Sequence, residues 1–115
     1  MTKTPLEHVE QVSFVNWFRS NYQGVLIFAI PNGGLRNISV ARKLQAEGVE
    51  PGIPDLFIPA WRLWIEMKRA KGGRLSQEQI ELISYLDGCG YSIIVGHGFE
   101  DAKKKVLQFI DTCVE

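Results

Sequence analysis

The sequence predicts a single α/β domain, spanning residues 1–115, in which helices flank a mixed β-sheet. Three observations lead to this fold class. Segments with apolar residues at helical spacing alternate with short runs of β-forming residues, and breaks rich in glycine and proline separate them. A chain of 115 residues also has room for one hydrophobic core and not for two. The segments follow one another in the order α β α β β α β α.

The first half of the chain contains two expected helices and one expected strand. Positions in residues 6–22 repeat at i, i+3 and i+4 spacing, which is typical of a helix. Residues 25–30 are a continuous apolar run rich in β-forming side chains, so we expect a buried strand. The Pro-Asn-Gly-Gly sequence at 31–34 then breaks the chain into a loop. A second helix over 38–47 is expected to end at Gly48.

The second half begins with an expected β-hairpin. A rigid turn at 51–54 leads into a strand over 55–59, and a second strand over 63–69 returns antiparallel to it. The remaining expected elements are a helix capped by Ser76 and ending near residue 87, a strand over 91–95, and a closing helix over 99–112.

The composition is that of an ordinary globular protein, with 45% hydrophobic and 23% charged residues, and not that of a disordered one. No apolar run approaches the length of a membrane span, and the first residues lack the apolar stretch of a secretory signal. Cys89 and Cys113 do not have the spacing of a metal site or a disulfide framework. We therefore expect a cytoplasmic protein.

The charged residues are balanced in number but unevenly placed. Thirteen basic and thirteen acidic residues give a net charge of zero, which argues against a protein that coats nucleic acid. Between Arg62 and Arg74, however, five residues are basic and Glu66 is the single acidic one. This segment is either a phosphate-binding surface or a solvated charged loop.

The expected hairpin brings three chemically active side chains together. If it turns at Ala60-Trp61, Asp55 lies directly opposite Glu66. Lys68 is two residues beyond Glu66, so these two side chains share one face of the strand. Ala-Trp is not a favoured two-residue turn, and a shift of the register by an even number of residues would preserve the face.

Two facing carboxylates repel one another unless a cation compensates them. A divalent metal ion with oxygen ligands would do so, and it would polarise a phosphoryl oxygen and activate a bound water. Lys68 beside such a site can orient the water or stabilise a pentacovalent phosphate. The alternative is a surface ion pair between Glu66 and Lys68, with Asp55 only starting a strand.

Five motifs occur in an order that resembles the VRR-NUC branch of the PD-(D/E)XK nuclease superfamily, over nearly the whole chain. The closest likeness is to the compact stand-alone members found in phages and prophages, and it implies a restriction-endonuclease-like core of the αβααβ type. The motifs are Glu7-His8-Val9-Glu10-Gln11, Ile30-Pro31-Asn32-Gly33-Gly34, the segment from Gly48 to Asp55, Ile65-Glu66-Met67-Lys68, and Ser76-x-x-Gln79.

The resemblance implies a role for each matching side chain. Asp55 and Glu66 would bind Mg²⁺ or Mn²⁺, and Lys68 would act on the attacking water. A glutamate of the first helix would complete the metal shell. Glu7 fits the family's E-x-x-x-Q spacing, while Glu10 lies on the same helical face, so both are candidate metal ligands. A further candidate in the catalytic set is Gln79.

The resemblance also implies a substrate and an assembly. We expect a structure-selective DNA endonuclease that resolves four-way (Holliday) junctions as a homodimer in DNA repair, in the cytoplasm of a bacterial host. The alternatives are a flap or other structure-specific nuclease, and a non-catalytic nucleic-acid-binding module on a nuclease fold. Candidate substrate-binding residues are Gln11, Asn32, Arg36, Arg69 and Lys71. The region of Trp61 and Trp64 and the last helix are candidate dimer surfaces.

Overall fold

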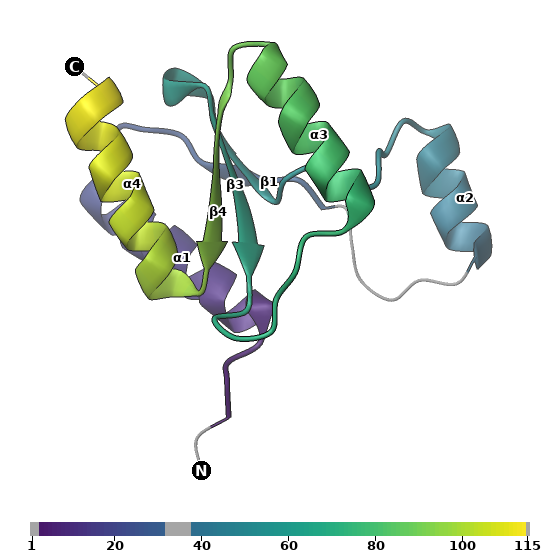
Figure 1. The fold of residues 1–115 in the computed structure, drawn as a ribbon, viewed down its shortest axis with the longest axis horizontal. Coiled ribbons are helices and arrows are strands. Elements are labelled where there is room, and N and C mark those ends of the chain that lie inside the picture. The colour runs from purple at the N-terminus through teal and green to yellow at the C-terminus, as the bar shows by residue number, and fades with distance from the viewer. Residues whose placement is uncertain (1–2, 32–37, 115) are drawn as a thin grey trace.

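The computed structural model describes residues 3–31 and 38–114 of the chain. Its sheet has four strands in the order β1 (Phe28–Ala29), β2 (Leu56–Ile58), β3 (Leu63–Lys68) and β4 (Ser92–His97) (Figure 1). β1 pairs antiparallel with β2, β2 pairs antiparallel with β3, and β3 pairs parallel with β4. The predicted mixed sheet and the predicted order of helices and strands are therefore confirmed.

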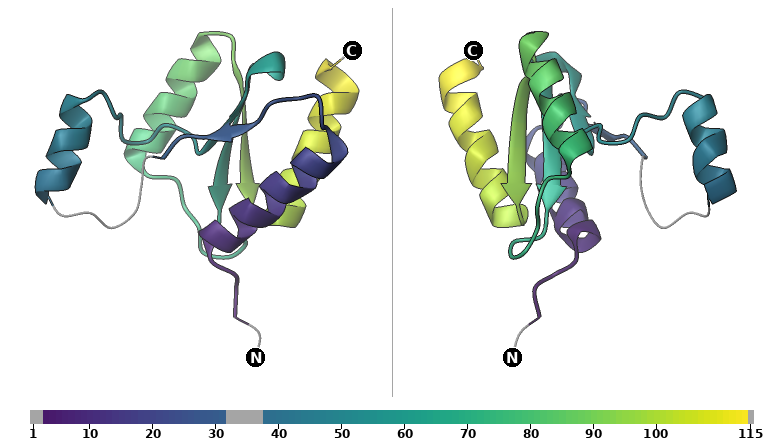
Figure 2. Two further views of the ribbon diagram at one scale, coloured as in Figure 1. Left: turned by 180° about the vertical axis from the view of Figure 1, so that it is seen from behind. Right: turned by 45° about the vertical axis from the view of Figure 1, so that its right-hand side comes forward.

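Three helices pack on the sheet. α1 (Glu7–Asn21) and α4 (Phe99–Cys113) cover one face, where they enclose the hydrophobic core. α3 (Gln77–Gly88) lies over the other face beside β4 (Figure 2). The core consists of apolar side chains from α1, α4, the strands and the segment before β1: Phe14, Phe18, Ile27, Leu56, Ile58, Leu63, Ile65, Met67, Ala102 and Val106.

The alternation of side chains along β3 separates the core from a polar face. Leu63, Ile65 and Met67 point into the core, and all three are fully buried. Successive side chains of a strand point to opposite faces, so Trp64, Glu66 and Lys68 point towards the face that carries α3. Alternate residues of β3 therefore point into the hydrophobic core and towards the polar face that carries α3.

α3 and α1 begin in different ways. The Ser76 side chain accepts a 3.1 Å hydrogen bond from the Gln79 N–H, and the Gln79 side chain accepts a 2.8 Å bond from the Ser76 N–H. This reciprocal capping box satisfies two amides at the start of α3. At the start of α1 the N-cap residue is Leu6, whose side chain makes no capping bond.

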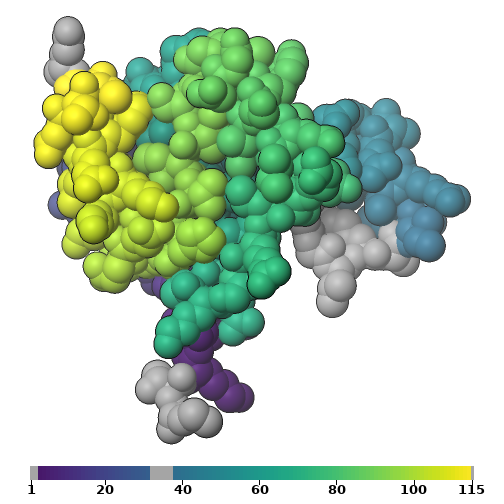
Figure 3. All heavy atoms as spheres, in the orientation of Figure 1, coloured from purple at the N-terminus to yellow at the C-terminus, as the bar shows by residue number. Residues whose placement is uncertain are grey.

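α2 (Ile38–Ala46) stands away from the rest of the protein. The helix was expected, and the views agree that it lies to one side of the body (Figures 1 and 3). None of its residues is buried, and Ile38 is 69% exposed. α2 therefore contributes no residue to the hydrophobic core of this chain.

The strand predicted over 25–30 is wrong in length and in burial. Only Phe28 and Ala29 form a strand, and both are exposed. Among the described residues, β1 is an edge strand that pairs with β2 alone, so one of its sides has no neighbouring strand there. The apolar run matches a buried strand in composition, but among these residues only Ile27 enters the core.

The hairpin has the predicted register and a different turn. Leu56 pairs with Ile65 and Ile58 pairs with Leu63, as expected. The link is a 3₁₀ turn over Pro59–Trp61, not a two-residue turn at Ala60-Trp61. Arg62 closes it with a left-handed φ of 50°. The strand expected over 91–95 is also displaced towards His97, because β4 pairs along the whole of β3.

The two tryptophans near the hairpin pack within the protein. Trp61 lies edge-on to Phe18, with ring centroids 5.5 Å apart. Trp64 packs on Phe57 of β2, with centroids 4.3 Å apart. Both tryptophans are half-buried, so their aromatic surface is largely used inside this chain.

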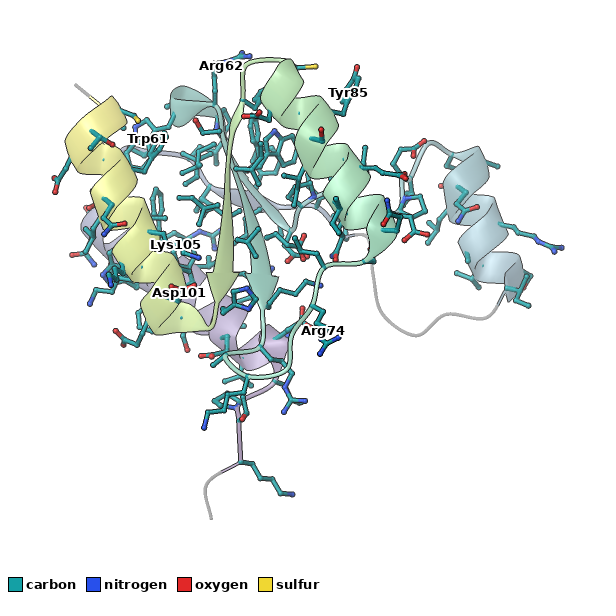
Figure 4. The ribbon with its side chains drawn as sticks, in the orientation of Figure 1. Trp61, Arg62, Arg74, Tyr85, Asp101 and Lys105 are labelled. Carbon is teal, nitrogen blue, oxygen red and sulfur yellow. The ribbon has the colours of Figure 1, made fainter. Side chains whose placement is uncertain are left out.

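The outer edge of β4 carries two charged side chains from α4 (Figure 4). Lys105 donates a 2.7 Å hydrogen bond to the carbonyl of Val95, and the carboxylate of Asp101 accepts a 2.8 Å bond from the N–H of His97. Lys105 and Asp101 also form an ion pair of 3.0 Å. Two backbone groups of this edge are therefore occupied.

In the described part of the chain, no helix is long and apolar enough to cross a membrane.

Candidate active site

Asp55 lies at the entrance to β2, beside Glu66 of β3. Leu56 pairs antiparallel with Ile65. Asp55, which precedes Leu56, therefore lies next to Glu66, which follows Ile65. Oδ2 of Asp55 accepts a 2.8 Å hydrogen bond from the backbone N–H of Met67. This bond fixes the carboxylate against the strand that carries Glu66.

The turn that leads to Asp55 is held against α3. Gly52 has a φ of 92°, in the left-handed region that favours glycine. A Cβ at Gly52 would lie 2.8 Å from the backbone carbonyl carbon of Glu78, in the first turn of α3. The turn packs so closely that only glycine fits. Asp55 and Gln79 are therefore held in a fixed relation by the backbone.

Glu66 is the centre of the polar cluster and is only 2% exposed. Its Oε2 atom accepts a 3.0 Å hydrogen bond from Nε2 of Gln79 and lies 3.8 Å from Nζ of Lys68. Its Oε1 atom is buried and has no hydrogen-bond partner within residues 3–31 and 38–114. An unsatisfied buried carboxylate oxygen is unfavourable, so the cluster lacks a positive partner at this atom.

Burial raises the pKa of both carboxyl groups. For Glu66, burial and then the negative charge of Asp55 raise the pKa to about 8. The pKa of Asp55 is raised mainly by burial, although the hydrogen bond from Met67, the side-chain hydrogen bond with Glu66 and the charge of Lys68 act in the opposite direction. In the absence of a cation, the pair therefore retains a proton at neutral pH.

The two glutamates of α1 have different surroundings. Glu7 lies close enough for its charge to contribute to the raised pKa of Glu66. The carboxylate of Glu10 packs against Gly98 at the start of α4, where a Cβ would lie 2.5 Å from Oε2 of Glu10. Of the two candidate ligands, Glu7 is the one whose charge contributes to the pKa of Glu66, and this contribution is smaller than those of burial, Asp55 and Lys68.

The other candidate residues are spread around the site. Gln11 lines a groove of about 290 Å³ between α1 and β1, together with Leu56. Lys71 is exposed in the link between β3 and α3, and Arg74 extends from the same link (Figure 4). Asn32 and Arg36 lie outside the described residues.

Arg69 was expected to contact substrate, but its described contact is with the chain itself. Its Nη2 atom donates a 3.1 Å hydrogen bond to the carbonyl of Thr4, in the segment that precedes α1. Its Nε atom is buried with no hydrogen-bond partner in the part of the chain that the structure describes. Part of this guanidinium is therefore turned into the protein.

Two contacts of the site were missed by sequence reasoning. Gln79 was expected near the site, but its use both as a cap of α3 and as a donor to Glu66 was not. The Ser-x-x-Gln spacing at 76–79 is a capping-box signal that could have revealed the first of these contacts. The bond between Arg69 and Thr4 joins positions 65 residues apart and leaves no local signal.

The fold resembles that of a solved structure. A chain described as "VRR_NUC domain protein" superimposes with a TM-score of 0.78 and 26% sequence identity, over 96% of this chain and 92% of that one. The chain has the VRR-NUC fold. No family model matches the sequence, and no curated protein matches it either. The VRR-NUC fold makes this a nuclease-like domain, and the candidate site lies on the α3 face of its sheet.

The residues of the site fit the divalent cation that a VRR-NUC fold implies. Asp55 and Glu66 are hard oxygen donors, of the type that Mg²⁺ and Mn²⁺ prefer. The unpartnered Oε1 of Glu66 and the raised pKa values are the features expected where a cation is needed to balance two carboxylates. Within the described ranges, no three His, Cys, Asp or Glu side chains cluster closely enough to form a metal centre by themselves.

Proposed function

We propose that this chain is a divalent-metal-dependent DNA endonuclease that hydrolyses phosphodiester bonds at Asp55, Glu66 and Lys68. The observation that carries the proposal is the buried Oε1 of Glu66, which has no partner among the described residues although Asp55 and Lys68 lie beside it. A buried carboxylate oxygen without a partner is unfavourable, and a bound cation would compensate it. In a site that binds a cation and a phosphate, Oε1 of Glu66 would be available to the cation.

Asp55 and Glu66 would hold Mg²⁺ or Mn²⁺, and Glu7 of α1 is the candidate third ligand. When bound, the ion would polarise a phosphoryl oxygen and lower the pKa of a coordinated water. Gln79 keeps the Glu66 carboxylate in its orientation through the 3.0 Å hydrogen bond, and Met67 does the same for Asp55. The catalytic residues are thus oriented before substrate arrives.

Lys68 supplies a positive charge at the site. It is 8% exposed, and its ammonium group lies 3.8 Å from Glu66. An ammonium group in this position can orient the attacking water and stabilise the charge that develops on the phosphate. Lys68 therefore acts on the reacting atoms, while Asp55 and Glu66 act through the cation.

We propose branched DNA as the substrate, with the four-way junction as the first candidate. The likeness to a VRR-NUC structure extends over 96% of these residues, and we propose that this fold recognises the shape of the DNA and not its sequence. Two copies related by a two-fold axis would suit the two symmetric cuts that a four-way junction requires.

Exposed apolar surface supports a homodimer. α2 buries no residue, and Ile38 is 69% exposed. The groove between α1 and β1 is bordered by Val12 and Phe28, which are 45% and 37% exposed. A second copy that placed its α2 in this groove would remove both apolar surfaces from water, which is favourable.

The test is cleavage of labelled four-way junction, flap and linear duplex DNA with Mg²⁺ or Mn²⁺, beside Asp55→Asn and Lys68→Ala. We expect symmetric junction cuts that both substitutions reduce by about 10²–10³-fold or more. Preferential cutting of flaps would support the nuclease activity and show that its substrate is a flap and not a four-way junction. Metal-independent DNA binding without cleavage, unchanged in both variants, would leave a binding module on a nuclease fold.

A further inference from the structure

The link between β3 and α3, residues 69–76, folds back over the end of β3. A Cβ at Gly73 would lie 2.9 Å from Cβ of Lys68 and 3.0 Å from the backbone nitrogen of Arg69. Neither atom is the free end of a flexible side chain, so a side chain at position 73 would push the link away from the strand. Glycine therefore keeps the link against Lys68, and the next residue is Arg74.

The other end of the link is fixed by the cap of α3. Ser76 and Gln79 exchange two hydrogen bonds, of 2.8 and 3.1 Å, and Gln79 also donates a 3.0 Å bond to Glu66. Arg74 lies one residue after Gly73 and two residues before Ser76. The backbone at Arg74 is thus held between two fixed points that both belong to the candidate site.

The side chain of Arg74 is exposed and extends from the link below α3 (Figure 4). It makes no hydrogen bond or ion pair with any residue that the structure describes. Two neighbouring arginines are already used within the chain. Arg69 donates a hydrogen bond to the carbonyl of Thr4, and the guanidinium of Arg62 lies 4.1 Å from the ring centroid of Tyr91. Arg74 therefore has a guanidinium available to a ligand.

The position of Arg74 favours an anionic ligand. Lys68 already supplies a positive charge at the site, 3.8 Å from Glu66. A second cation held nearby without a partner adds repulsion in the free protein, and a bound anion would compensate it. A planar guanidinium can donate two parallel hydrogen bonds to one phosphate, which an ammonium group cannot do.

We propose that Arg74 binds a backbone phosphate of the DNA next to the phosphate that is cleaved, in a position fixed by Gly73 and by the cap of α3. The inference rests on the proposed function, because it takes DNA as the substrate. It assigns to Arg74 the substrate contact that was expected of Arg69. Phosphate contacts fix the register of a protein on DNA and carry no direct sequence information, which suits recognition by shape.

The experiment measures binding of the full chain to labelled four-way junction DNA at about 50–200 mM salt, with a chelator present to prevent cleavage. Arg74→Gln is expected to weaken binding by about tenfold at the lowest salt and to reduce the salt dependence by about one phosphate contact. The matched control is Lys104→Gln, which removes one charge from an exposed position of α4, on the other face of the sheet. The control should stay within about twofold of the original affinity, and both variants should unfold at the original urea concentration.

Two further variants test the geometry of the contact. Arg74→Lys keeps the charge and loses the planar donor pair, so it should retain the salt dependence of the original and give an intermediate affinity. Gly73→Ala displaces the link from Lys68. In this background, Arg74→Gln should weaken binding by less than about threefold, because the guanidinium is no longer held at the phosphate.

Other outcomes would overturn the proposal. Equal losses of affinity in Arg74→Gln and Lys104→Gln would assign the effect to net charge alone. A full effect of Arg74→Gln in the Gly73→Ala background would show that the link does not position the side chain.

The proposed function can fail separately from this inference. If the original chain cleaves junctions with Mg²⁺ while Arg74→Gln binds and cleaves them equally well, only this inference fails. If Arg74→Gln loses one phosphate contact but the original chain cleaves no DNA, the inference stands and the nuclease fails. An original chain that binds no DNA would overturn both.

Discussion

Burial has opposite energetic effects on the two faces of β3. On one face, Leu63, Ile65 and Met67 are fully buried against apolar side chains, which stabilises the fold. On the other face, Glu66 and Lys68 are almost as buried, at 2% and 8% exposed. There the same loss of water destabilises the charged form of the glutamate and raises its pKa.

This difference shows how a small domain can accommodate a buried cluster of charged side chains. Burial of two carboxyl groups lowers stability. A strand that faced an apolar core on both sides could not carry such a pair. Because side chains alternate along β3, the apolar face can be as tightly packed as any core while the other face retains buried, chemically active groups. Substitutions on the two faces should therefore separate stability from activity.

The largest effect is expected from Glu66→Gln. Cleavage should fall by about 10²–10³-fold or more, because a neutral amide is a poor ligand for a hard cation. The metal-free protein should nevertheless become more stable at pH 8, by roughly 1–4 kcal/mol, because a buried charge is removed. Cleavage assays and urea unfolding with a chelator present measure the two effects. A variant that loses both activity and stability would contradict the separation of the faces.

Ile65→Ala, one residue away, should behave in the opposite way. Truncation of a fully buried isoleucine leaves a cavity, and the free energy of unfolding should fall by about 2–5 kcal/mol. Mn²⁺ affinity of the folded fraction should stay within about twofold of the original, because the side chain points away from the site. Urea unfolding and Mn²⁺ titration at low temperature provide the comparison. Metal affinity that falls in step with stability would show that the two faces are coupled.

The polar face should also make the stability of the metal-free protein depend on pH. The pKa of Glu66 rises from 4.5 to about 8 on folding, so the folded state keeps a proton that the unfolded state has lost. Its contribution is complete below pH 4.5 and disappears as the pH rises through 8. The difference of about 3.5 between the two pKa values, at about 1.4 kcal/mol for each pKa unit, corresponds to a loss of roughly 5 kcal/mol over this interval, measured by urea unfolding with a chelator. The decline should be much smaller in Glu66→Gln, and an equal decline in both would assign it to other groups.

The smallest effect is expected at Gln79, which contacts both the site and its own helix. Gln79→Ala removes the amide from Glu66 and one half of the capping box. Stability should fall by about 1 kcal/mol, and Mn²⁺ affinity by about tenfold. Ser76→Ala is the matched control, since it weakens the same cap and leaves the bond to Glu66 in place. A similar loss of Mn²⁺ affinity in the control would trace the effect to the helix and not to the hydrogen bond.

Local contacts of the site could be predicted from the sequence. The register that places Asp55 beside Glu66 follows from a short hairpin, in which few residues separate the partners and few pairings are possible. The position of α3 was anticipated for the same kind of reason, because Ser76 is a local capping signal. Local patterns therefore predicted the centre of the site.

Contacts between distant segments could not be predicted. Glu7 and Glu10 lie on one face of α1, and the packing of Glu10 on Gly98, which distinguishes their surroundings, is a tertiary contact. The bond from Arg69 to Thr4 has no counterpart in any local pattern. The exposure of β1 was missed because an apolar run does not reveal whether its strand lies at the edge of a sheet. Each of these depends on how elements far apart in the chain come together.

The charged pair on the outer edge of β4 bears on solubility. An unpaired strand edge invites strands of other molecules to add to the sheet, which is the first step towards fibrils. Lys105 and Asp101 occupy the Val95 carbonyl and the His97 N–H, so an incoming strand would have to displace an ion pair. An incoming strand would meet backbone groups that are already hydrogen-bonded, which disfavours edge-to-edge joining of sheets along β4.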